Sequence, residues 1–283
     1  MKRLHLRVAA CLTALSLACG AAAQAPETVA VFGMRDPVDK SYRKILKGME
    51  LFERLHAMAP SAQLRFKLLP RRQDTDMAGI TLKVIGDTLS IPVPIAADQT
   101  FSLERNDRAL AEDAAVMPNR KAGSMTWRAE IRTPGLPPNT RRLGDLRLEC
   151  KVGMEAGLVS NQRSILGQLG ELLEVVMDYC EALEPYYLFF SDHPLFGVTL
   201  RAGERAQALS IDQLYAGISR HPMSESDLSY CDCQVLLDRT YFLPLGDRSW
   251  PDDTLVEVEY IEDDGASPEA SGTRASPTPV VEP

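Results

Sequence analysis

This chain of 283 residues is poor in the side chains on which metal sites and nucleophilic catalysis depend. Only His56, His193 and His221 follow the first 23 residues, and no two of them stand at the spacing of metal ligands. No Gly-x-Ser-x-Gly segment is present to hold a nucleophilic serine on a sharp turn, and the acidic residues near the C-terminus do not follow the EF-hand spacing. We therefore predict no metal, no cofactor and no catalytic residues.

Acidic residues outnumber basic ones, and long apolar runs are scarce. The formal net charge is −8, and it falls to −11 once the three basic residues of the N-terminal leader are removed. Nucleic acid and anionic membranes carry the same sign of charge and would repel such a chain, so neither is an expected partner. After residue 23 no apolar run approaches the length of about eighteen residues that a transmembrane helix needs, so no transmembrane span is expected.

The first 23 residues have the three parts of a secretory signal peptide. An apolar stretch over residues 8–17, too short to cross a bilayer, is preceded by basic residues and followed by small ones, namely Lys2, Arg3 and Arg7 before it and Ala21, Ala22 and Ala23 after it. Cleavage after Ala23 would leave Gln24 as the N-terminus of a periplasmic or secreted protein. Lipidation of Cys19 is the less favoured alternative, because a lipobox has leucine three residues before the cysteine and this chain has Ser16 there.

Residues 24–61 are predicted to form an extended segment and then one amphipathic helix. Asp36 suits the N-cap, and Pro37 suits the first helical position. Apolar side chains then recur at intervals of three and four residues, the spacing of one helix face: Val38, Tyr42, Ile45, Met49 and Phe52. Pro60 ends the pattern.

From residue 62 to residue 153 the apolar period changes to two, which is typical of strands with one buried face. Five segments alternate in this way: residues 64–68, 80–84, 89–93, 127–131 and 146–152. Gly86 and Asp87 favour a tight turn between the second and third segments, and Pro92 indicates that the third lies at a sheet edge. The pattern predicts an antiparallel β-sandwich over residues 62–153.

A meander over residues 79–103 ends in a turn with Asp98, followed by a Phe-x-Leu strand. This segment resembles the prealbumin-like sandwiches of carboxypeptidase regulatory-type domains, apart from Gln99, where that family typically has a turn glycine. The resemblance extends over about residues 62–153, and it implies a structural or binding module without catalytic residues. Farther along, residues 247–253 resemble a segment of uncharacterised exported bacterial proteins, which implies no function.

The rest of the chain is predicted to contain a second amphipathic helix over residues 162–183 and a smaller α+β part, which together fill residues 154–262. Residues 263–283 have no aromatic side chain and are rich in Pro, Ser and Ala, so we predict a disordered tail. The expected fold class is therefore α+β, mainly β, with an antiparallel sandwich packed against two amphipathic helices.

Four cysteines follow the leader: Cys150, Cys180, Cys231 and Cys233. In an oxidising compartment an even number of cysteines favours disulfides. Cys150 shares the inward register of the last predicted strand, and Cys180 lies on the apolar face of the second helix, which must pack against an apolar surface. We therefore predict a Cys150–Cys180 disulfide between helix and sandwich. Cys231 and Cys233 are left as a strained local pair or as free thiols, and a metal there is disfavoured because further ligands are missing.

A binding surface is suggested by basic residues at the ends of predicted strands and by one tryptophan: Arg71, Arg72, Arg120, Lys121, Arg141, Arg142 and Trp250. If the basic pairs gathered at one end of the sandwich they would attract anionic groups, and a tryptophan offers a face on which a sugar stacks. Loop exposure explains the same basic residues without any ligand. The acidic residues between Asp252 and Asp264 are interpreted as the solvated side of a strand.

Ser191, Asp192 and His193 are a hydroxyl, an acid and a base in adjacent positions, but the side chains of neighbours point apart, so we interpret them as turn residues. The leading hypothesis is an exported, non-catalytic binding or structural protein of the bacterial cell envelope, with an envelope protein or a glycan as its partner. One alternative is a secreted hydrolase of glycans or esters, which for glycans needs two carboxylates facing each other across a cleft. Another is a subunit of an envelope assembly.

Overall fold

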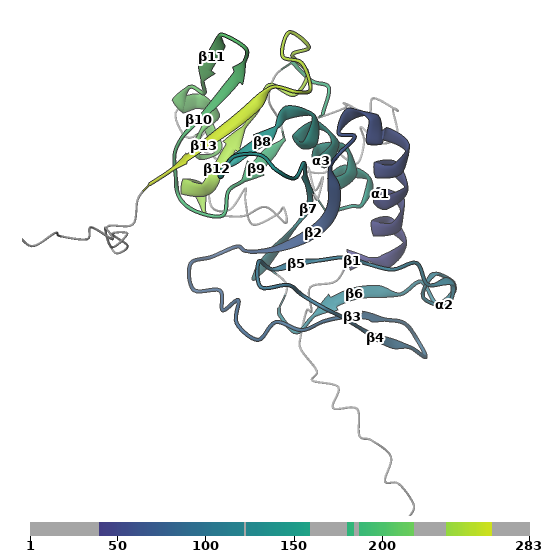
Figure 1. The fold of residues 1–283 in the computed structure, drawn as a ribbon. Helices are drawn as coiled ribbons and strands as arrows, with labels where there is room; N and C mark the ends of the chain where they lie inside the picture. The colour runs from purple at the N-terminus through teal and green to yellow at the C-terminus, as the bar shows by residue number, and fades with distance from the viewer. Residues whose placement is uncertain (1–39, 122, 159–179, 184–186, 218–235, 262–283) are drawn as a thin grey trace, which may run out of the picture. The chain divides into compact units, whose positions relative to one another are not determined.

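A computed structural model of the chain describes residues 40–121, 123–158, 180–183, 187–217 and 236–261, all within the unit Met34–Pro283 (Figure 1). Several predicted features lie outside the described residues: the leader, Asp36 and Pro37, most of the second helix, Cys231, Cys233 and the C-terminal tail. None of the helices in the described ranges is long and apolar enough to cross a membrane.

The described helices are α1 (Tyr42–Leu55), α2 (Asp107–Ala111) and α3 (Leu143–Glu155), with short 3-10 helices η1 (His56–Met58), η2 (Ile211–Gln213), η3 (Tyr215–Gly217) and η4 (Leu237–Arg239). The strands are β1 (Lys40–Ser41), β2 (Gln63–Pro70), β3 (Leu82–Ile85), β4 (Ser90–Val93), β5 (Thr100–Phe101), β6 (Ala115–Pro118), β7 (Met125–Arg132), β8 (Thr140–Arg142), β9 (Leu188–Phe190), β10 (Leu195–Ala202), β11 (Arg205–Ala208), β12 (Thr240–Phe242) and β13 (Leu255–Tyr260). The predicted class, α+β and mainly β, is confirmed.

These strands form antiparallel sheets in the orders β1-β6-β3-β4, β5-β2-β7, β11-β10-β13-β8 and β12-β9. Apart from β1, the strands of the first two sheets come from the region expected to form a sandwich, and that packing arrangement stays a prediction. Strand β8 precedes residue 153 in the chain but pairs with β13, so the N-terminal region supplies a strand to a sheet of the C-terminal region.

Helix α1 begins where Ser41 caps it. The Ser41 side chain accepts a hydrogen bond from the backbone N–H of Lys44, at 3.3 Å. Because Lys40 and Ser41 pair with β6 as strand β1, the helix begins at Tyr42 and not, as predicted, near Asp36. From Tyr42 onward its predicted apolar face is confirmed, with the side chains of Tyr42, Ile45 and Phe52 buried and that of Met49 partly buried, whereas Val38 lies outside the described residues.

The longest strand pair is β2 with β7, which confirms two of the predicted strands (Figure 1). Phe66 and Trp127 lie on their buried face, as the alternation predicts. Strands β3 and β4 form the predicted hairpin, and β4 lies at the edge of its sheet, as Pro92 indicates. The turn itself lies one residue later than predicted, because the Gly86 N–H donates to the carbonyl oxygen of Leu89 at 3.0 Å.

The predicted strand over residues 146–152 is wrong, since these residues belong to α3. Each helical residue advances by about 100°, so residues four apart share a side. Leu146 and Cys150 therefore lie on one side of α3, and Leu148 and Val152 lie on the opposite side. Both sides are buried, and a helix that is buried all round shows no single apolar stripe in its sequence.

Helix α3 lies between two apolar clusters. The first core contains buried side chains of α1, β2, β3, β6 and β7, together with Leu148 and Val152 of α3. The second core contains buried side chains of β9, β10, β12 and β13, together with Leu146 and Cys150. Helix α1 packs closely against the end of α3. A Cβ atom placed at Gly48 would lie only 2.7 Å from the Cβ of Ala156, the residue that follows α3.

The predicted disulfide between Cys150 and Cys180 is confirmed, with Cα atoms 5.8 Å apart. It starts from a helix and not, as expected, from a strand. Cys180 itself lies in a turn, so the end of the predicted second helix, residues 180–183, is not helical. Beside the disulfide, the Lys151 Nζ lies 2.6 Å from a carboxylate oxygen of Glu181, which ties the same turn to α3.

Candidate functional site

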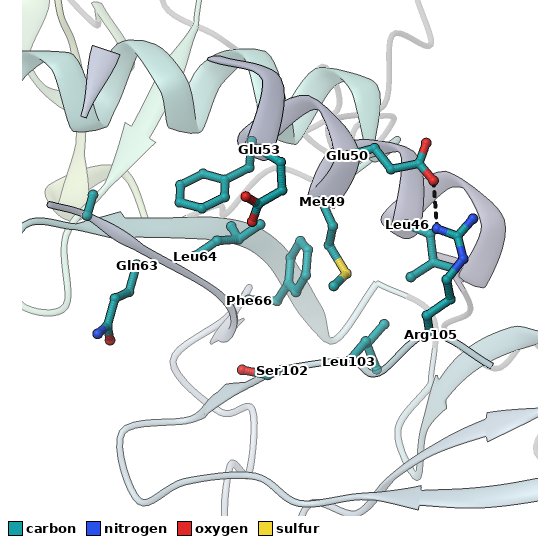
Figure 2. A pocket seen from close by; sticks show the side chains of 12 residues that line it. Leu46, Met49, Glu50, Glu53, Gln63, Leu64, Phe66, Ser102, Leu103 and Arg105 are labelled. Carbon is teal, nitrogen blue, oxygen red and sulfur yellow. Dashed lines mark hydrogen bonds and ion pairs between the residues drawn. The ribbon is translucent and has the colours of Figure 1, made fainter. Parts of the chain in front are cut away.

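An open groove of about 440 Å³ lies between α1, the beginning of β2 and the chain that follows β5 (Figure 2). Its floor is apolar and is made by six side chains of these segments: Leu46, Met49, Phe52, Leu64, Phe66 and Leu103. Most of them also belong to the first core, which holds them in place from below. A volume of this size and an apolar lining are typical of ligand sites.

Three charged side chains stand at the rim of the groove: Glu50, Glu53 and Arg105. Arg105 and Glu50 form an ion pair of 2.8 Å, and this hydrogen bond from the guanidinium lowers the pKa of the Glu50 carboxyl. Glu53 is exposed and forms no hydrogen bond or ion pair with any residue that the structure describes. Among the described residues, Glu53 is therefore the one rim charge without an ionic partner.

The arrangement of the groove suits binding better than bond cleavage. Glu50 and Glu53 are three residues apart on α1, so both carboxylates stand on one wall. A glycosidase needs its two carboxylates on opposite sides of the bond that is cleaved. Ser102 brings a hydroxyl to the lining, and none of the described residues of the lining is a histidine or a cysteine.

The polar face of β2 and β7 is covered by the β9 region. Lys67 and Arg128, which are opposite each other in the two strands, are both buried. The guanidinium carbon of Arg128 lies 3.8 Å from the centre of the Phe190 ring, in a cation–π contact with the last residue of β9. Alternation of polar and apolar residues gave no sign that this second face is buried too.

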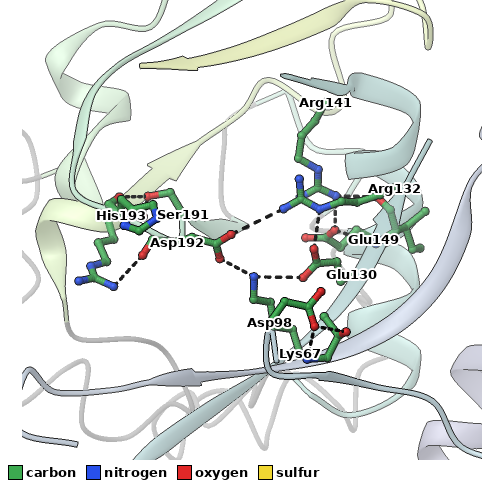
Figure 3. A network of polar contacts seen from close by, with 12 residues as sticks. Lys67, Asp98, Glu130, Arg132, Arg141, Glu149, Ser191, Asp192 and His193 are labelled. Carbon is green, nitrogen blue, oxygen red and sulfur yellow. Dashed lines mark hydrogen bonds and ion pairs between the residues drawn. The ribbon is translucent and has the colours of Figure 1, made fainter. Parts of the chain in front are cut away.

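Two cations and two carboxylates meet beside this face (Figure 3). Lys67 Nζ lies 2.6 Å from Asp192 Oδ1 and 3.6 Å from Glu130 Oε2. Arg132 Nε lies 2.5 Å from Glu130 Oε1, and its Nη2 lies 4.0 Å from Asp192 Oδ2. Burial raises the pKa of the Asp192 carboxyl, but the neighbouring positive charges, of Lys67 above all and also of Arg132, together outweigh this effect and hold that pKa below its ordinary value. The charges in this cluster balance.

A second ion pair, between Arg141 and Glu149, is buried where β7 ends (Figure 3). Arg141 Nη2 donates to Glu149 Oε2 at 2.5 Å and to the carbonyl oxygen of Ile131 at 2.7 Å. The backbone N–H of Ile131 donates to the same Glu149 oxygen at 3.2 Å. Burial raises the pKa of nearby Tyr187 to about 12, so this phenol is protonated at neutral pH.

Ser191, Asp192 and His193 form a turn between β9 and β10, as interpreted from the sequence. The Ser191 hydroxyl donates to the backbone carbonyl of His193 at 2.5 Å, the Asp192 carboxylate contacts Lys67, and the His193 ring packs edge-on against Tyr260. The three side chains thus have three different partners, which is not the geometry of a serine nucleophile and its base.

Four of the predicted binding-surface residues lie at one end of the β2–β7 pair. Arg71 and Arg72 follow β2, and Arg120 and Lys121 follow β6. Ser124 links the two segments, because it accepts a hydrogen bond from the Arg71 N–H at 3.0 Å and donates one to the Lys121 carbonyl at 3.2 Å. Within the group, the Arg120 guanidinium is held by the backbone carbonyls of Asp76 and Ala78, and Arg71 is buried.

The other three predicted binding-surface residues lie elsewhere. Arg141 contacts Ile131, near the opposite end of β7 from Arg71, and Arg142 is its neighbour in β8, a strand that sequence reasoning treated as a loop. Trp250 is buried in the second core, with the Arg205 guanidinium carbon 3.5 Å from its ring centre. The structure therefore does not gather these residues on one surface.

Two acidic residues of the C-terminal strand region form ion pairs with different arginines. Asp252 Oδ1 lies 2.6 Å from Arg147, and the Glu257 carboxylate pairs with Arg201 at 3.0 Å. Within the described ranges, no three histidine, cysteine or acidic side chains gather as a metal site would require. Comparison with protein-family models, with curated proteins and with solved structures finds no match to this chain.

Sequence reasoning missed the groove, although it identified part of its lining. Met49 and Phe52 were recognised as members of the apolar face of α1, and Leu64 and Phe66 as members of a strand. A pattern of apolar positions shows which side chains turn inward, but it does not show where two packed elements diverge. No signal in this sequence marks the point of divergence.

Proposed function

We propose that this chain is a non-catalytic binding protein, exported to the bacterial cell envelope by its leader, and that the groove between α1 and β2 is its binding site. The observation that carries the proposal is the apolar floor of the groove, about 440 Å³ in volume and open to solvent. Met49 and Leu64 are the floor side chains that are only partly buried, so an occupant would remove apolar surface of these two residues from water.

The charges near the groove support binding in preference to hydrolysis. The Glu50 carboxylate forms an ion pair with Arg105, and Glu53 lies on the same wall of the groove as Glu50. The richer polar cluster around Lys67 and Asp192 consists of ion pairs that join the two halves of the molecule, so its charged groups already have partners.

Binding of the neutral, environment-sensitive dye Nile red to the mature protein tests the proposal. We expect saturable binding, and binding about tenfold weaker in a Met49→Gln variant, because the substitution places an amide in the floor of the groove. Met117→Gln is the matched control, since Met117 lies in β6 and does not line the groove. Equal binding by the wild type and both variants would contradict the proposal.

The remaining alternatives are tested with the same preparation. N-terminal sequencing of the protein from a periplasmic fraction is expected to read Gln24 first, as cleavage after Ala23 requires. Incubation with peptidoglycan, polysaccharides and simple esters is expected to yield no product. Turnover that is lost on substituting a groove carboxylate would instead establish the hydrolase alternative.

A further inference from the structure

Strand β2 has a free edge beside the groove. On one side β2 pairs with β7 along its whole length, but on the other side β5 reaches only Phe66 and Lys67. The Leu68 N–H donates to the Gln99 carbonyl at 3.1 Å, which shows that the backbone groups of Leu68, and with them those of Phe66 and Leu64, face the β5 side. Between the start of β2 at Gln63 and Phe66, this side of the strand has no partner strand among the described residues.

The contacts of Ile131 confirm this orientation of Leu64. Ile131 lies opposite Leu64 in β7, yet its N–H donates to Glu149 and its carbonyl accepts from Arg141. Because Ile131 directs both groups away from β2, the pair it makes with Leu64 is not hydrogen-bonded. The N–H and C=O of Leu64 therefore point toward the groove side.

The gap at this edge has a physical cause in Tyr42. The Tyr42 hydroxyl donates to the carbonyl of Glu104 and accepts a hydrogen bond of 2.8 Å from the Asn106 N–H. These bonds hold the chain after β5 against the beginning of α1, so it leaves β2 after Phe101 instead of continuing alongside it. The groove occupies the space between them, with Leu64 on one side and Leu103 on the other (Figure 2).

We infer that the occupant of the groove is an extended peptide segment of a partner protein, which adds a strand to β2 at Leu64, places an apolar side chain on the groove floor and sets a lysine or arginine beside Glu53. This inference rests on the proposed function and names the class of ligand. A peptide supplies both features that the site presents, because its backbone matches the free amide groups and its alternate side chains face the floor.

The charge of the site selects among peptides. Arg105 is neutralised by Glu50, and Glu53 is left to attract a basic side chain. The mature chain is strongly acidic, which also disfavours acidic peptides. A second copy of this chain is a poorer occupant for the same reason, because it would bring another acidic molecule to an edge that already carries the free Glu53 carboxylate.

A displayed library of twelve-residue peptides, panned on the mature protein, tests the inference. We expect enriched peptides to carry apolar residues at alternate positions with a nearby lysine or arginine. One enriched peptide is then synthesised with a single backbone N-methyl group at each position in turn, which removes one N–H donor at a time. Methylation is expected to weaken binding at least about tenfold at the one position whose N–H donates to the Leu64 carbonyl, and less than about threefold at the others. Leu64 lies between Ala62 and Phe66, whose backbone groups on this side already have partners, so it offers one N–H and one C=O to the peptide.

Glu53→Gln is expected to weaken binding of the basic peptide about threefold to tenfold. Glu155→Gln, which removes an equal charge from an exposed site outside the groove, is expected to leave binding unchanged. Both side chains are exposed, so the two variants should fold like the wild type.

Three results would overturn the inference. The first is peptide binding that every N-methyl position weakens alike or none weakens. The second is failure to enrich any peptide while Nile red still binds, in which case the proposed function stands and only the ligand class is wrong. The third is concentration-dependent dimerisation by light scattering that Glu53→Gln strengthens, which would identify a second copy as the occupant. Loss of the Met49→Gln effect on Nile red binding would instead remove the proposed function itself.

Discussion

Arg141 and Glu149 carry opposite charges in the interior of the molecule, where each depends on the other. Glu149 accepts hydrogen bonds from Arg141 and from the Ile131 backbone, so one carboxylate fixes the end of β7 against α3. Burying a charge without its partner is costly because water no longer solvates it. The pair therefore affects stability mainly when one member is removed and the other stays buried without a counter-charge.

Replacing Glu149 by glutamine is expected to lower the free energy of unfolding by about 3–5 kcal/mol, since Arg141 would stay buried without a counter-charge. Urea denaturation followed by circular dichroism measures the loss. Glu257→Gln serves as the control, because the Arg201–Glu257 pair is exposed and its loss should cost less than about 1 kcal/mol. Equal effects of the two variants would show that burial does not govern these pairs.

Asp192 should make stability depend on pH in the acid range. Its pKa in the folded protein lies below the ordinary value, because Lys67 and Arg132 together outweigh the effect of burial. The carboxylate then contributes stability above the pKa of the unfolded chain, about 3.9, and this contribution is lost as the pH falls through the folded pKa. An Asp192→Asn variant should therefore lose less stability than the wild type as the pH falls below about 4.

Urea denaturation over a series of pH values measures this difference in slope. Asp113→Asn is the matched control, because the Asp113 side chain is 77% exposed and pairs with an exposed arginine. It should follow the pH dependence of the wild type. A parallel pH dependence for Asp192→Asn and the wild type would contradict the assignment.

Single residues were predictable where one physical requirement determines their environment. Trp127 was assigned to the core from its register, and it is buried. The Cys150–Cys180 disulfide followed from the need of two apolar elements to meet. The buried position of Arg141 was not predictable, because its partner Glu149 was assigned to the polar side of a strand that does not exist.

At the scale of elements, α3 shows why a period of two does not prove a strand. Leu146, Leu148, Cys150 and Val152 alternate with polar residues, but in a helix the same four positions form two pairs on opposite sides. A strand and a helix over these residues could be distinguished only if the residues between the four apolar positions were exposed. Here Arg147 and Glu149 are buried as well, because Arg147 pairs with Asp252 and Glu149 pairs with Arg141. The sequence therefore could not distinguish a strand from a helix that lies between two cores.

The disulfide between α3 and the turn at Cys180 should contribute substantially to stability. It joins residues 30 apart in the chain, and in the chain-entropy model such a loop is worth about 3–4 kcal/mol. A Cys150→Ala, Cys180→Ala double variant is expected to lose that amount in urea denaturation. Reduction of the wild type should reproduce the loss, whereas reduction of the double variant should change its stability little. A loss below about 1 kcal/mol would contradict the prediction.

The turn at Cys180 also packs tightly against Gly246. A Cβ atom at Gly246 would lie 2.3 Å from the carbonyl oxygen of Glu181 and 2.5 Å from that of Ala182, and backbone atoms cannot easily move away. Gly246→Ala is therefore expected to destabilise the protein by about 1–3 kcal/mol in thermal or urea denaturation. Gly197→Ala is the control, because no atom lies within 4 Å of the Cβ position there, and it should not destabilise.

For the whole molecule, the shared helix predicts that both cores unfold together. The chain has two tryptophans, and one lies in each core, Trp127 in the first and Trp250 in the second. Trp250→Phe and Trp127→Phe variants therefore report on one core each by fluorescence. In each variant we expect the fluorescence midpoint in urea to coincide with the midpoint from far-UV circular dichroism. Separate midpoints in either variant would show that the cores unfold independently.

The overall class was predictable because β2, β3, β4 and β7 lie in segments whose apolar residues alternate, and because α1 has a clear apolar stripe. What the sequence could not give is how the sheets associate. The alternation of Lys67 and Arg128 with apolar neighbours indicates one buried face, yet the other face is covered by the β9 region through ion pairs and a cation–π contact. Contacts of this kind depend on residues far apart in the chain, such as Lys67 and Asp192, and have no local signature.

Because α3 contributes to both cores, the part of the chain before it and the part after it are expected to evolve together. A rearranged gene that encoded only the residues up to α3 would leave Leu143, Leu146 and Cys150 on an uncovered, water-facing side of the helix. The reciprocal fragment would lack the helix that closes its own core. With their present residues, the two parts must therefore be duplicated or lost together. A descendant that kept only the residues up to the end of α3 would need polar residues at these three positions.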